Sequence, residues 1–505
     1  MEQAISAGYG TGDAVSGEFV TLEGERYYAI RNVDRMAPFF ISVISSADHW
    51  LFVSSTGGLT AGRISPETAL FPYIPVDRVH ESPPHTGPMT VLRVQADGQR
   101  QLWEPFSLES EARFAISRHL YKNMLGNKLC FEEVNHDLNL VFRYTWKTSD
   151  EFGFVRRCEL RNSGGRPLQV DVLDGLQNIL PAGTPLLAQT NTSNLVDAYK
   201  WTELDTATGL GIFTLYSGVS DRAEPCESLK ANTVFATGFE RHRVLISSEQ
   251  LDAFRAGAEA EQETHKRGIR GAYFVSASVE VLPGQSQVWQ LVADVEQSQT
   301  RVVELRNRLQ RQTDIEGAIA ASVDMCDDEL ARIMAAADSF QVSAQETVSS
   351  HHYANVLFNI LRGGIFNDQY NVSSRDFSRT VRHFNRGVYS RNEALLGSLP
   401  DTLNYDELMT KVRVHGDPQL ERLCCEYLPI TFGRRHGDPS RPWNRFAIKL
   451  KDEFGNRLLS YEGNWRDIFQ NWEALTFSYP EFIENVIAKF VNASTMDGYN
   501  PYRIT

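Results

Sequence analysis

The sequence lacks the features that would place the chain in or across a membrane. It contains no run of about 18 apolar residues, so no segment could span a bilayer as a helix. The N-terminal stretch MEQAISAGYGTGD has neither the basic start nor the apolar centre of a signal peptide. We therefore expect a cytoplasmic protein, in which the sequons at Asn191, Asn371 and Asn492 are chance matches.

Cysteine is scarce, and its spacing does not suit a metal. None of the 6 cysteines lies in a Cys-x-x-Cys or Cys/His spacing that would hold zinc. Cys424 and Cys425 are adjacent, which favours buried thiols over a disulfide. The sequence thus predicts a reduced protein without a metal or a bound cofactor.

Positive charge is in deficit. The 50 Lys and Arg residues against 64 Asp and Glu give a net charge of -14 and a pI of about 5.4. Nucleic acid and anionic membranes repel an acidic protein, so we expect neither as a partner. With 42% hydrophobic and 23% charged residues the composition is that of a globular protein, and 505 residues indicate two or three domains.

Residues 1 to about 300 have the pattern of β structure. Short alternating segments bounded by Gly, Pro, Asn or Asp recur at 27–31, 39–44, 51–54, 89–94, 138–146 and 288–293. In residues 138–146, one face is shared by Leu138, Leu140, Phe142 and Tyr144. Turns are expected at Gly164–Gly165 and at Pro283–Gly284. This pattern predicts a large sandwich of antiparallel sheets.

The pattern becomes helical near residue 300. Residues 300–340 contain no Gly or Pro except Gly317, and their apolar residues recur at helical spacing, which predicts two linker helices. We expect the helix to continue over residues 350–372, whereas residues 373–460 are polar, rich in arginine and unassigned. After Pro480, one face of a further helix is formed by Phe482, Ile483, Val486, Ile487 and Phe490. The part that starts near residue 345 should be mainly α.

Residues 431–474 are the richest in side chains suited to chemistry. They include Arg434, Arg435, His436, Asp438, Arg441, Trp443, Arg445, Glu462, Trp465, Arg466, Asp467, Gln470 and Trp472. Sugar recognition needs such a mixture, because aromatic rings cover the C–H face of a pyranose while carboxylates, amides and guanidinium groups bond its hydroxyls. The composition is equally compatible with a solvated arginine-rich loop beside a helix whose Trp residues pack in a core.

Three shorter patterns have a plain structural interpretation. The adjacent His351 and His352 point in different directions on a helix, so a helix start is favoured over a metal or base pair. Residues 55–58, Ser-Thr-Gly-Gly, lack the following Lys of a phosphate loop and predict a sharp turn between strands. Asp497–Gly498 predicts another turn.

Two segments in the C-terminal part resemble a known family. YEGNWRDIFQNWEAL, which starts at Tyr461, and MDGYNPYRIT, which starts at Met496, are similar to the start of the catalytic barrel in cellobiose phosphorylases of glycoside hydrolase family 94. That family has an Arg-Asp-Ser-x-Gln-Asp type motif, then a helix, then an Asp-Gly-Gly-x-Tyr turn. The first motif is matched by Arg466, Asp467 and Gln470, and the second by Asp497 and Gly498. Residues 17–58 also look like the family's opening, with a Gly-x-Phe strand, a Tyr-x-Ile strand, a Pro and a Ser-x-Thr-Gly-Gly turn.

The resemblance implies a fold and an activity. It implies an N-terminal antiparallel β-super-sandwich over residues 1–298, a helical linker over 299–344 and the beginning of an (α/α)6 barrel over 345–505. The family cleaves β-glucosidic bonds with inorganic phosphate and inverts the anomeric centre, with an Asp as general acid. The partners so implied are an oligosaccharide or other β-glucoside, phosphate, and a second copy of the chain, because the family usually forms dimers.

The resemblance also implies roles for individual residues. It assigns sugar binding to Trp465, Arg466, Asp467, Gln470 and Asn471. Asn471 stands where the family has Asp, which weakens one expected contact. The family's catalytic Asp would lie beyond Thr505, so no catalytic residue is expected within this chain. The segment GRRHGDPSRPWN does not match the family, and its candidates for phosphate binding, chosen by chemistry alone, are Arg434, Arg435 and Arg441.

Two other functions stay open. The chain could be part of an inverting hydrolase on the same scaffold, with water in place of phosphate. It could also be a non-catalytic carbohydrate-binding protein that kept the sandwich and lost the barrel. The near-complete motif at 461–473 favours an enzyme over the second alternative.

Overall fold

A computed structural model describes residues 14–96, 98–190, 194–218, 229–311, 314–433, 446–452, 455, 457–500 and 503–504. The chain divides into two compact units, Met1–Asp327 and Asp328–Thr505. The division lies inside helix α7 (Ile315–Ala335), within the segment that the sequence predicts as a linker.

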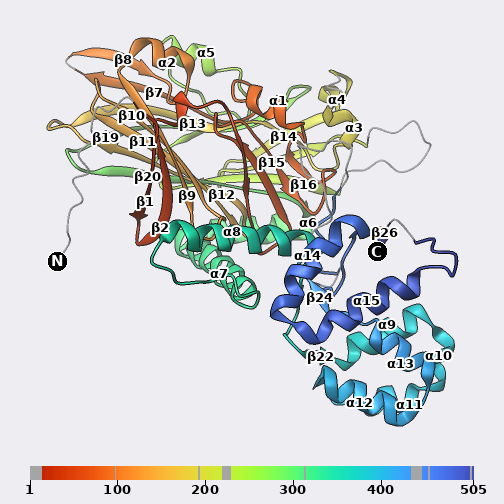
Figure 1. Ribbon diagram of the computed structural model, residues 1–505. Helices are drawn as coiled ribbons and strands as arrows, with labels where there is room; N and C mark the ends of the chain where they lie inside the picture. The colour runs from red at the N-terminus through yellow and green to blue at the C-terminus, as the bar shows by residue number, and fades with distance from the viewer. Residues whose placement is uncertain are drawn as a thin grey trace. The chain divides into compact units, whose positions relative to one another are not determined.

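The N-terminal unit is built on a large antiparallel sheet (Figure 1). Among the described residues it has eleven strands, in the spatial order β1 (Ser16–Leu22), β2 (Glu25–Arg31), β9 (Ile116–Asn123), β10 (Leu129–Asn135), β11 (Leu140–Ser149), β12 (Gly153–Asn162), β20 (Ser286–Ser298), β16 (Lys230–Thr237), β15 (Leu210–Leu215), β14 (Lys200–Asp205) and β18 (His265–Arg267). The β12–β20 pair joins strands far apart in the sequence, with Cys158 opposite Trp289.

Two smaller antiparallel sheets complete the sandwich. In the described residues, one has five strands, in the order β17 (Arg243–Leu245), β19 (Gly271–Val281), β13 (Leu168–Ile179), β7 (Gly87–Ala96) and β8 (Gln99–Trp103). The other has four, in the order β3 (Phe40–Val43), β4 (His49–Ser54), β5 (Leu59–Arg63) and β6 (Ala69–Phe71). The large antiparallel, sheet-rich N-terminal part predicted from the sequence is thereby confirmed.

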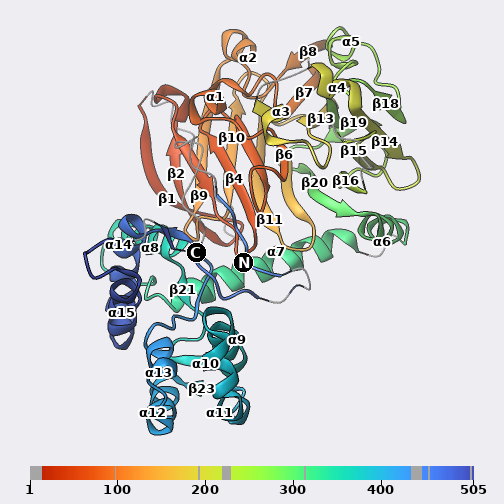
Figure 2. The same cartoon turned by 90° about the vertical axis from the view of Figure 1, so that its right-hand side faces the viewer.

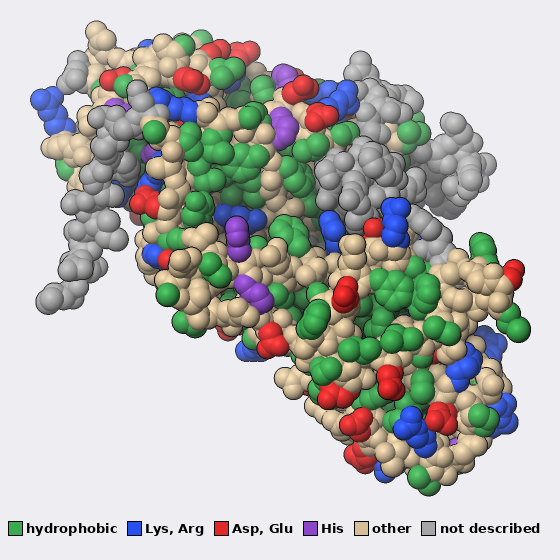
Figure 3. Space-filling model, in the orientation of Figure 1, with side chains coloured by type: hydrophobic (Ala, Val, Ile, Leu, Met, Phe, Trp, Pro, Cys, Tyr) green, Lys and Arg blue, Asp and Glu red, His purple; other side chains and the backbone are tan. Residues whose placement is uncertain are grey.

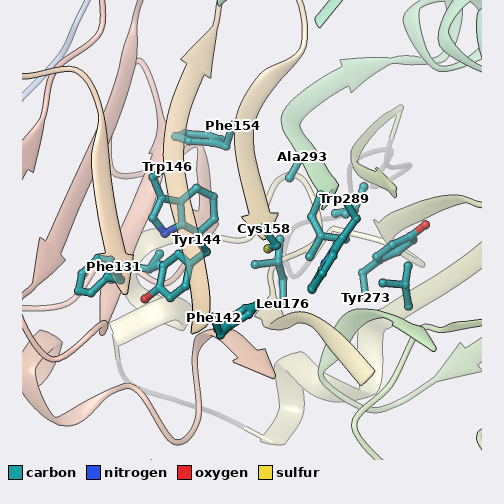
Figure 4. Close-up of a cluster of buried hydrophobic side chains, with 14 of the residues drawn as sticks. Phe131, Phe142, Tyr144, Trp146, Phe154, Cys158, Leu176, Tyr273, Trp289 and Ala293 are labelled. Atoms are coloured by element: carbon teal, nitrogen blue, oxygen red, sulfur yellow. The ribbon is translucent and has the colours of Figure 1, made fainter. Parts of the chain in front are cut away.

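One apolar core lies between the large sheet and the two smaller ones. It combines side chains from all three sheets, such as Val53, Phe142 and Val172. Figure 4 shows part of it, with Trp146, Phe154 and Trp289 among the buried side chains. The predicted face of β11 is correct, since the core includes Leu138, Leu140, Phe142 and Tyr144.

Both predicted turns connect consecutive strands. Gly164–Gly165 lies between β12 and β13, and Pro283–Gly284 between β19 and β20. Gly284 has a φ of 72°, which favours glycine because it lacks a Cβ.

Short helices accompany the sheets of the N-terminal unit. They are η1 (Val33–Arg35), α1 (Val76–Glu81), α2 (Leu108–Arg113), α3 (Leu186–Thr190), α4 (Asn194–Tyr199) and α5 (Leu251–Arg255). The two longer helices predicted for residues 300–340 are present as α6 (Gln299–Gln310) and α7. Both contribute to a cluster on the second face of the large sheet, where Ile319 and Val323 of α7 join Phe152 and Val292.

The C-terminal unit is mainly helical, as predicted. Its helices are α8 (Glu346–Gly363), α9 (Ser374–Phe384), α10 (Arg386–Arg391), α11 (Glu393–Ser398), α12 (Tyr405–His415), α13 (Pro418–Cys425), α14 (Trp465–Ser478), η2 (Pro480–Phe482) and α15 (Ile483–Ala493). Its short strands are β21 (Ile365–Phe366), β22 (Asn371–Ser373), β23 (Thr402–Asn404), β24 (Ile430–Thr431), β25 (Gly463–Asn464) and β26 (Arg503–Ile504). Helices α9 to α13 gather into one group in Figure 2.

Some helical predictions were wrong. The helix expected over 350–372 ends at Gly363, because Gly364 has a φ of 78° and the chain continues into β21. The segment 373–460, which the sequence left unassigned, contains five helices among its described residues, α9 to α13. The predicted face of α15 is only partly buried, since Phe482 and Val486 are buried whereas Ile483 and Ile487 are exposed. No helix within the described residues is long and apolar enough to cross a membrane.

Candidate functional site

The first turns of α14 carry the charged residues of the family-like motif. Arg466 is 80% exposed and Asp467 is 27% exposed, and the shortest distance from Arg466 Nε to Asp467 Oδ1 is 4.0 Å. Gln470, one turn further along, is also exposed. The guanidinium group, the carboxylate and the amide are therefore available to hydroxyl groups of a ligand. Their role in binding sugar stays a prediction.

Trp465 and Asn471 lie on the buried side of the same helix. The Trp465 ring packs against Phe469 and Phe490, with centroids 5.2 Å away in each case. The Asn471 Nδ2 group donates to Asn359 Oδ1 at 3.0 Å. Both residues hold α14 in place, and a direct sugar contact by either stays a prediction. Among the described residues no acceptor lies within hydrogen-bond distance of the buried Trp465 Nε1.

A close crossing with α8 fixes the position of α14. The buried Trp472 donates its indole N–H to the carbonyl oxygen of Gly363 at 2.8 Å. A Cβ on Gly363 would lie 2.7 Å from Cβ of Asn471, so only glycine allows the two helices to approach this closely. Packing with α8 therefore sets the direction in which Arg466 and Asp467 point.

The two segments of the family resemblance lie side by side. β25 pairs with β26, with Gly463 opposite Ile504 and Asn464 opposite Arg503. An ion pair of 3.0 Å between Arg503 Nη2 and Glu462 Oε2 joins the same strands. The structure thus brings the chain that follows the Asp497–Gly498 turn back to the start of α14.

The Asp497–Gly498 segment is a tight turn, as predicted. Gly498 has a φ of 85°, and its N–H donates to Thr495 O at 2.9 Å. The Asp497 carboxylate accepts a hydrogen bond from the Thr495 hydroxyl, which lowers the pKa of Asp497. The Asp497 carboxylate therefore helps to close the turn through its hydrogen bond with Thr495.

The three arginines suggested for phosphate binding, Arg434, Arg435 and Arg441, lie outside the described residues. The shorter patterns have the structural roles that the sequence favours. His351 and His352 lie near the start of α8, where His352 Nε2 is 2.8 Å from the Asp338 carbonyl oxygen. Residues 55–58 form the predicted turn between β4 and β5.

The cysteines and acidic groups of the described region form no metal site. No group of three His, Cys, Asp or Glu side chains within the described residues is arranged to hold a metal ion. The thiols of Cys130, Cys158, Cys326 and Cys424 are buried, and that of Cys425 is half-buried. Burial raises the pKa of the Cys130 thiol to about 12.

A helical insertion is the feature that the sequence interpretation missed. Ile365 pairs with Thr431 and Phe366 with Ile430, so the chain leaves and returns through the two-stranded ribbon β21–β24. The segment between has its own buried residues, including Phe377, Leu408 and Leu420. Its helices begin at side-chain caps such as Asn385, Asn404 and Asp417. The pair Asp417-Pro418 is typical of a helix start and could have predicted the beginning of α13.

Comparison with protein families identifies this inserted segment. The model of glycoside hydrolase family 149 insertion domain 1 matches residues 366–429, a range that begins and ends at the β21–β24 ribbon. The match associates the chain with carbohydrate-active enzymes of the glycoside hydrolase or phosphorylase type. The broad resemblance predicted from the sequence is thus supported, but family 94 is not the family that matches. No curated protein is significantly similar to the sequence.

Solved structures give weak similarities. A bacterial glucoamylase complexed with acarbose has 10% sequence identity and a TM-score of 0.37, over 76% of this chain and 52% of the glucoamylase. A homologue of GalM/aldose epimerase from C. elegans has 9% identity and a TM-score of 0.28, over 52% of this chain and 100% of its own. A candidate kojibiose phosphorylase from the human microbiome has 5% identity and a TM-score of 0.22, over 70% and 34%. This chain therefore spans about half the length of the glucoamylase, and scores this low carry no weight for function.

Proposed function

We propose that the protein containing this chain is an inverting glycoside phosphorylase that cleaves β-glucosides with inorganic phosphate. The observation that carries the proposal is the family 149 insertion domain, inserted through the β21–β24 ribbon of the same unit that contains the motif helix α14. The pairing of β25 with β26 supports it, because both family-like segments then meet at the start of α14.

In this reaction a phosphate oxygen attacks the anomeric carbon. The new C–O bond forms on the face opposite the leaving group, the glycosidic C–O bond breaks, and a general acid protonates the departing oxygen. The product is a sugar 1-phosphate of inverted configuration. No cofactor takes part, and we assign the general acid to no residue of this chain.

The residues of α14 would bind the sugar at the non-reducing side of the cleaved bond. Arg466, Asp467 and Gln470 present donors and acceptors that match sugar hydroxyls, and the buried Trp465 would support them through its packing against Phe469 and Phe490. Phosphate would be held by guanidinium groups, for which Arg434, Arg435 and Arg441 are the candidates.

Each part of this chain would then correspond to a domain of the proposed enzyme. In the proposal, residues 1–298 are the super-sandwich, residues 299–344 the linker and residues 345–505 the beginning of an (α/α)6 barrel. The helices α8, α14 and α15 would belong to the barrel wall, and residues 366–429 would be inserted into it. A cytoplasmic homodimer completes the proposal.

A pair of matched substitutions on α14 tests the assignment of the sugar site. Asp467→Asn removes the charge of a motif carboxylate, and Glu473→Gln removes that of an exposed carboxylate two turns along the same helix. A charged hydrogen bond to substrate contributes about 1.5–3 kcal/mol, so Asp467→Asn should lower kcat/KM for β-linked glucose disaccharides by about 10- to 100-fold. Glu473→Gln should leave it unchanged. Equal activity in the two variants would contradict the assignment.

A further inference from the structure

Helix α15 is held against the insertion domain by buried polar and aromatic contacts. The Asn485 side chain is buried, and its Nδ2 group donates to Tyr405 Oη at 2.7 Å and to the Tyr427 carbonyl oxygen at 3.0 Å. Just before α15, the Phe482 ring stacks on Phe366 with a centroid distance of 4.1 Å. All three partners belong to the insertion domain. The start of α15 and the insertion domain therefore share one packed interior.

The second half of α15 packs on the start of the motif helix. The crossing with α8 holds α14 beyond its first turn. Near the start of α14, the Phe490 ring lies edge-to-face with Trp465 at a centroid distance of 5.2 Å and with Phe469 at 4.8 Å. Trp465 immediately precedes Arg466 and Asp467. Because closely packed rings transmit displacements, a shift of α15 would move the motif.

The outward face of α15 is exposed, with Ile483, Ile487 and Val491 on it. Figure 3 shows hydrophobic side chains gathered on the C-terminal unit in the region where Figure 1 draws this helix. Within the described residues, the main helix contacts of α15 are with α13 of the insertion domain, with α14 and with the adjoining η2. The position of α15 therefore depends on these elements.

Lys489 of α15 connects the insertion domain to the motif segment a second time. Its Nζ lies 5.1 Å from the ring centroid of Phe384 and 5.4 Å from that of Tyr461. Phe384 ends α9 in the insertion domain, whereas Tyr461 precedes β25 and packs edge-to-face on Trp472 at 4.9 Å. An ammonium group over an aromatic ring contributes about 0.5–1 kcal/mol at exposed sites. The charge of Lys489 thus joins one ring of the insertion domain to one ring beside α14.

We propose that the insertion domain holds the motif helix α14 in position through α15, and that Asn485 and Lys489 are positioning residues for sugar binding. Asn485 acts on α14 through Phe490 and Trp465, and Lys489 acts through Tyr461. A domain inserted between α8 and α14 would in this way set the affinity for sugar without touching it. The inference rests on the proposed function, because the sugar site named there lies on α14.

Hydrogen–deuterium exchange of the 505-residue chain tests whether the insertion domain holds α14. Tyr405→Phe removes the hydroxyl that accepts from Asn485 and leaves α14 and α15 unchanged, and Lys489→Met removes the ammonium group but keeps an unbranched apolar side chain. Each should speed exchange of the α14 backbone amides by roughly threefold to tenfold. The matched controls are Tyr389→Phe on α10 and Lys411→Met on α12, which remove the same groups elsewhere in the insertion domain and should not change this exchange.

Steady-state kinetics of the protein that contains this chain test the effect on sugar binding. Tyr405→Phe and Lys489→Met should raise KM for a β-linked glucose disaccharide by about threefold to tenfold and change kcat less than about twofold, because a displaced α14 binds substrate and transition state equally less well. Lys489→Arg keeps a cation near both rings and should restore a KM close to that of wild type. A loss of folded enzyme alone would lower kcat and leave KM unchanged.

The outcomes separate this inference from the proposed function. Unchanged exchange of α14 in both Tyr405→Phe and Lys489→Met would overturn the inference. So would faster exchange with an unchanged KM, because the position of α14 would then not determine sugar binding. A raised KM in both variants of a protein that releases glucose equally fast without phosphate would support the positioning role and overturn the proposed phosphorolysis.

Discussion

Arg156 and Asp174 form an ion pair across the two layers of the N-terminal sandwich. Arg156 Nη1 is 2.8 Å from Asp174 Oδ2, and both side chains are completely buried between β12 and β13. Asp174 also accepts hydrogen bonds from Thr90 Oγ1 at 2.6 Å and Trp289 Nε1 at 2.7 Å. The carboxylate therefore connects both layers of the core through charge-assisted hydrogen bonds.

Removing the charge of Asp174 should destabilise the protein strongly. Asp174→Asn leaves the Arg156 guanidinium buried without a counter-ion, which costs about 3–5 kcal/mol of unfolding free energy. Glu304→Gln, in the exposed Arg301–Glu304 pair of α6, is the matched control and should cost less than about 1 kcal/mol. Urea denaturation followed by tryptophan fluorescence measures both. If the two variants lost similar amounts of unfolding free energy, burial would not increase the contribution of the Arg156–Asp174 pair to stability.

Gly364 is expected to be irreplaceable where the insertion leaves α8. Its φ of 78° and ψ of -172° are accessible to glycine alone, and a Cβ would lie 2.4 Å from Ile430 Cγ2 in β24. Backbone strain of this kind costs about 1–3 kcal/mol, and the clash adds to it. Gly364→Ala should therefore lower the stability of the C-terminal unit by more than about 2 kcal/mol.

The matched control for Gly364 is Gly416, which ends α12. Its φ of 82° and ψ of 16° are left-handed, but a methyl group added there would have no other atom within 4 Å. Gly416→Ala should cost only about 1–2 kcal/mol. If differential scanning calorimetry gave equal decreases in Tm for the two variants, the close contact with β24 would not be what requires glycine at position 364.

The strands and turns that the sequence predicted correctly depend on local patterns of residues. Alternating polarity located the strands around Leu140 and Val292, and turn glycines such as Gly284 marked their ends. The order of strands could not be predicted, because the β12–β20 pair depends on contacts between distant segments. The helices of residues 373–425 were missed because they are short and begin at side-chain caps rather than at long apolar repeats.

The sequence singled out Arg466 and Asp467 by their motif, and the structure places both in the first turn of α14. That they face a cavity that binds sugar stays a prediction. The burial of Trp465 could not be foreseen, because it depends on packing against Phe490 of the next helix. The exposure of Ile487 on α15 was likewise not given by its helical spacing.

The lowered pKa of Lys122 should make the stability of the folded protein depend on pH. Its Nζ donates to Ser42 O at 2.6 Å, and desolvation lowers the pKa of the ammonium group from 10.5 to about 8. Between these values the unfolded chain binds the proton and the folded protein does not, so stability should rise with pH. The stability of wild type relative to Lys122→Met should therefore increase from pH 8 to pH 10. A constant difference in urea midpoint over this range would contradict the lowered pKa.

Residues 1–505 alone should not cleave glycosides. General-acid protonation of the leaving oxygen contributes about 10²–10⁴-fold to the rate, and the proposal assigns the acid to no residue of this chain. The assay is release of sugar 1-phosphate or free glucose from β-linked glucose disaccharides with phosphate present. Turnover by purified 1–505 that is lost in Asp467→Asn or Glu462→Gln would show instead that the acid lies in this segment.

The fate of water oxygen tests the proposed phosphorolysis most directly. The protein that contains this chain is incubated in H2 18O with inorganic phosphate and a β-linked glucose disaccharide, and the products are analysed by mass spectrometry and 31P NMR. Phosphorolysis predicts an α-configured sugar 1-phosphate without 18O, because phosphate and not water supplies the new oxygen at the anomeric carbon. Free glucose with 18O at its anomeric carbon, formed at the same rate without phosphate, would contradict the account and identify a hydrolase.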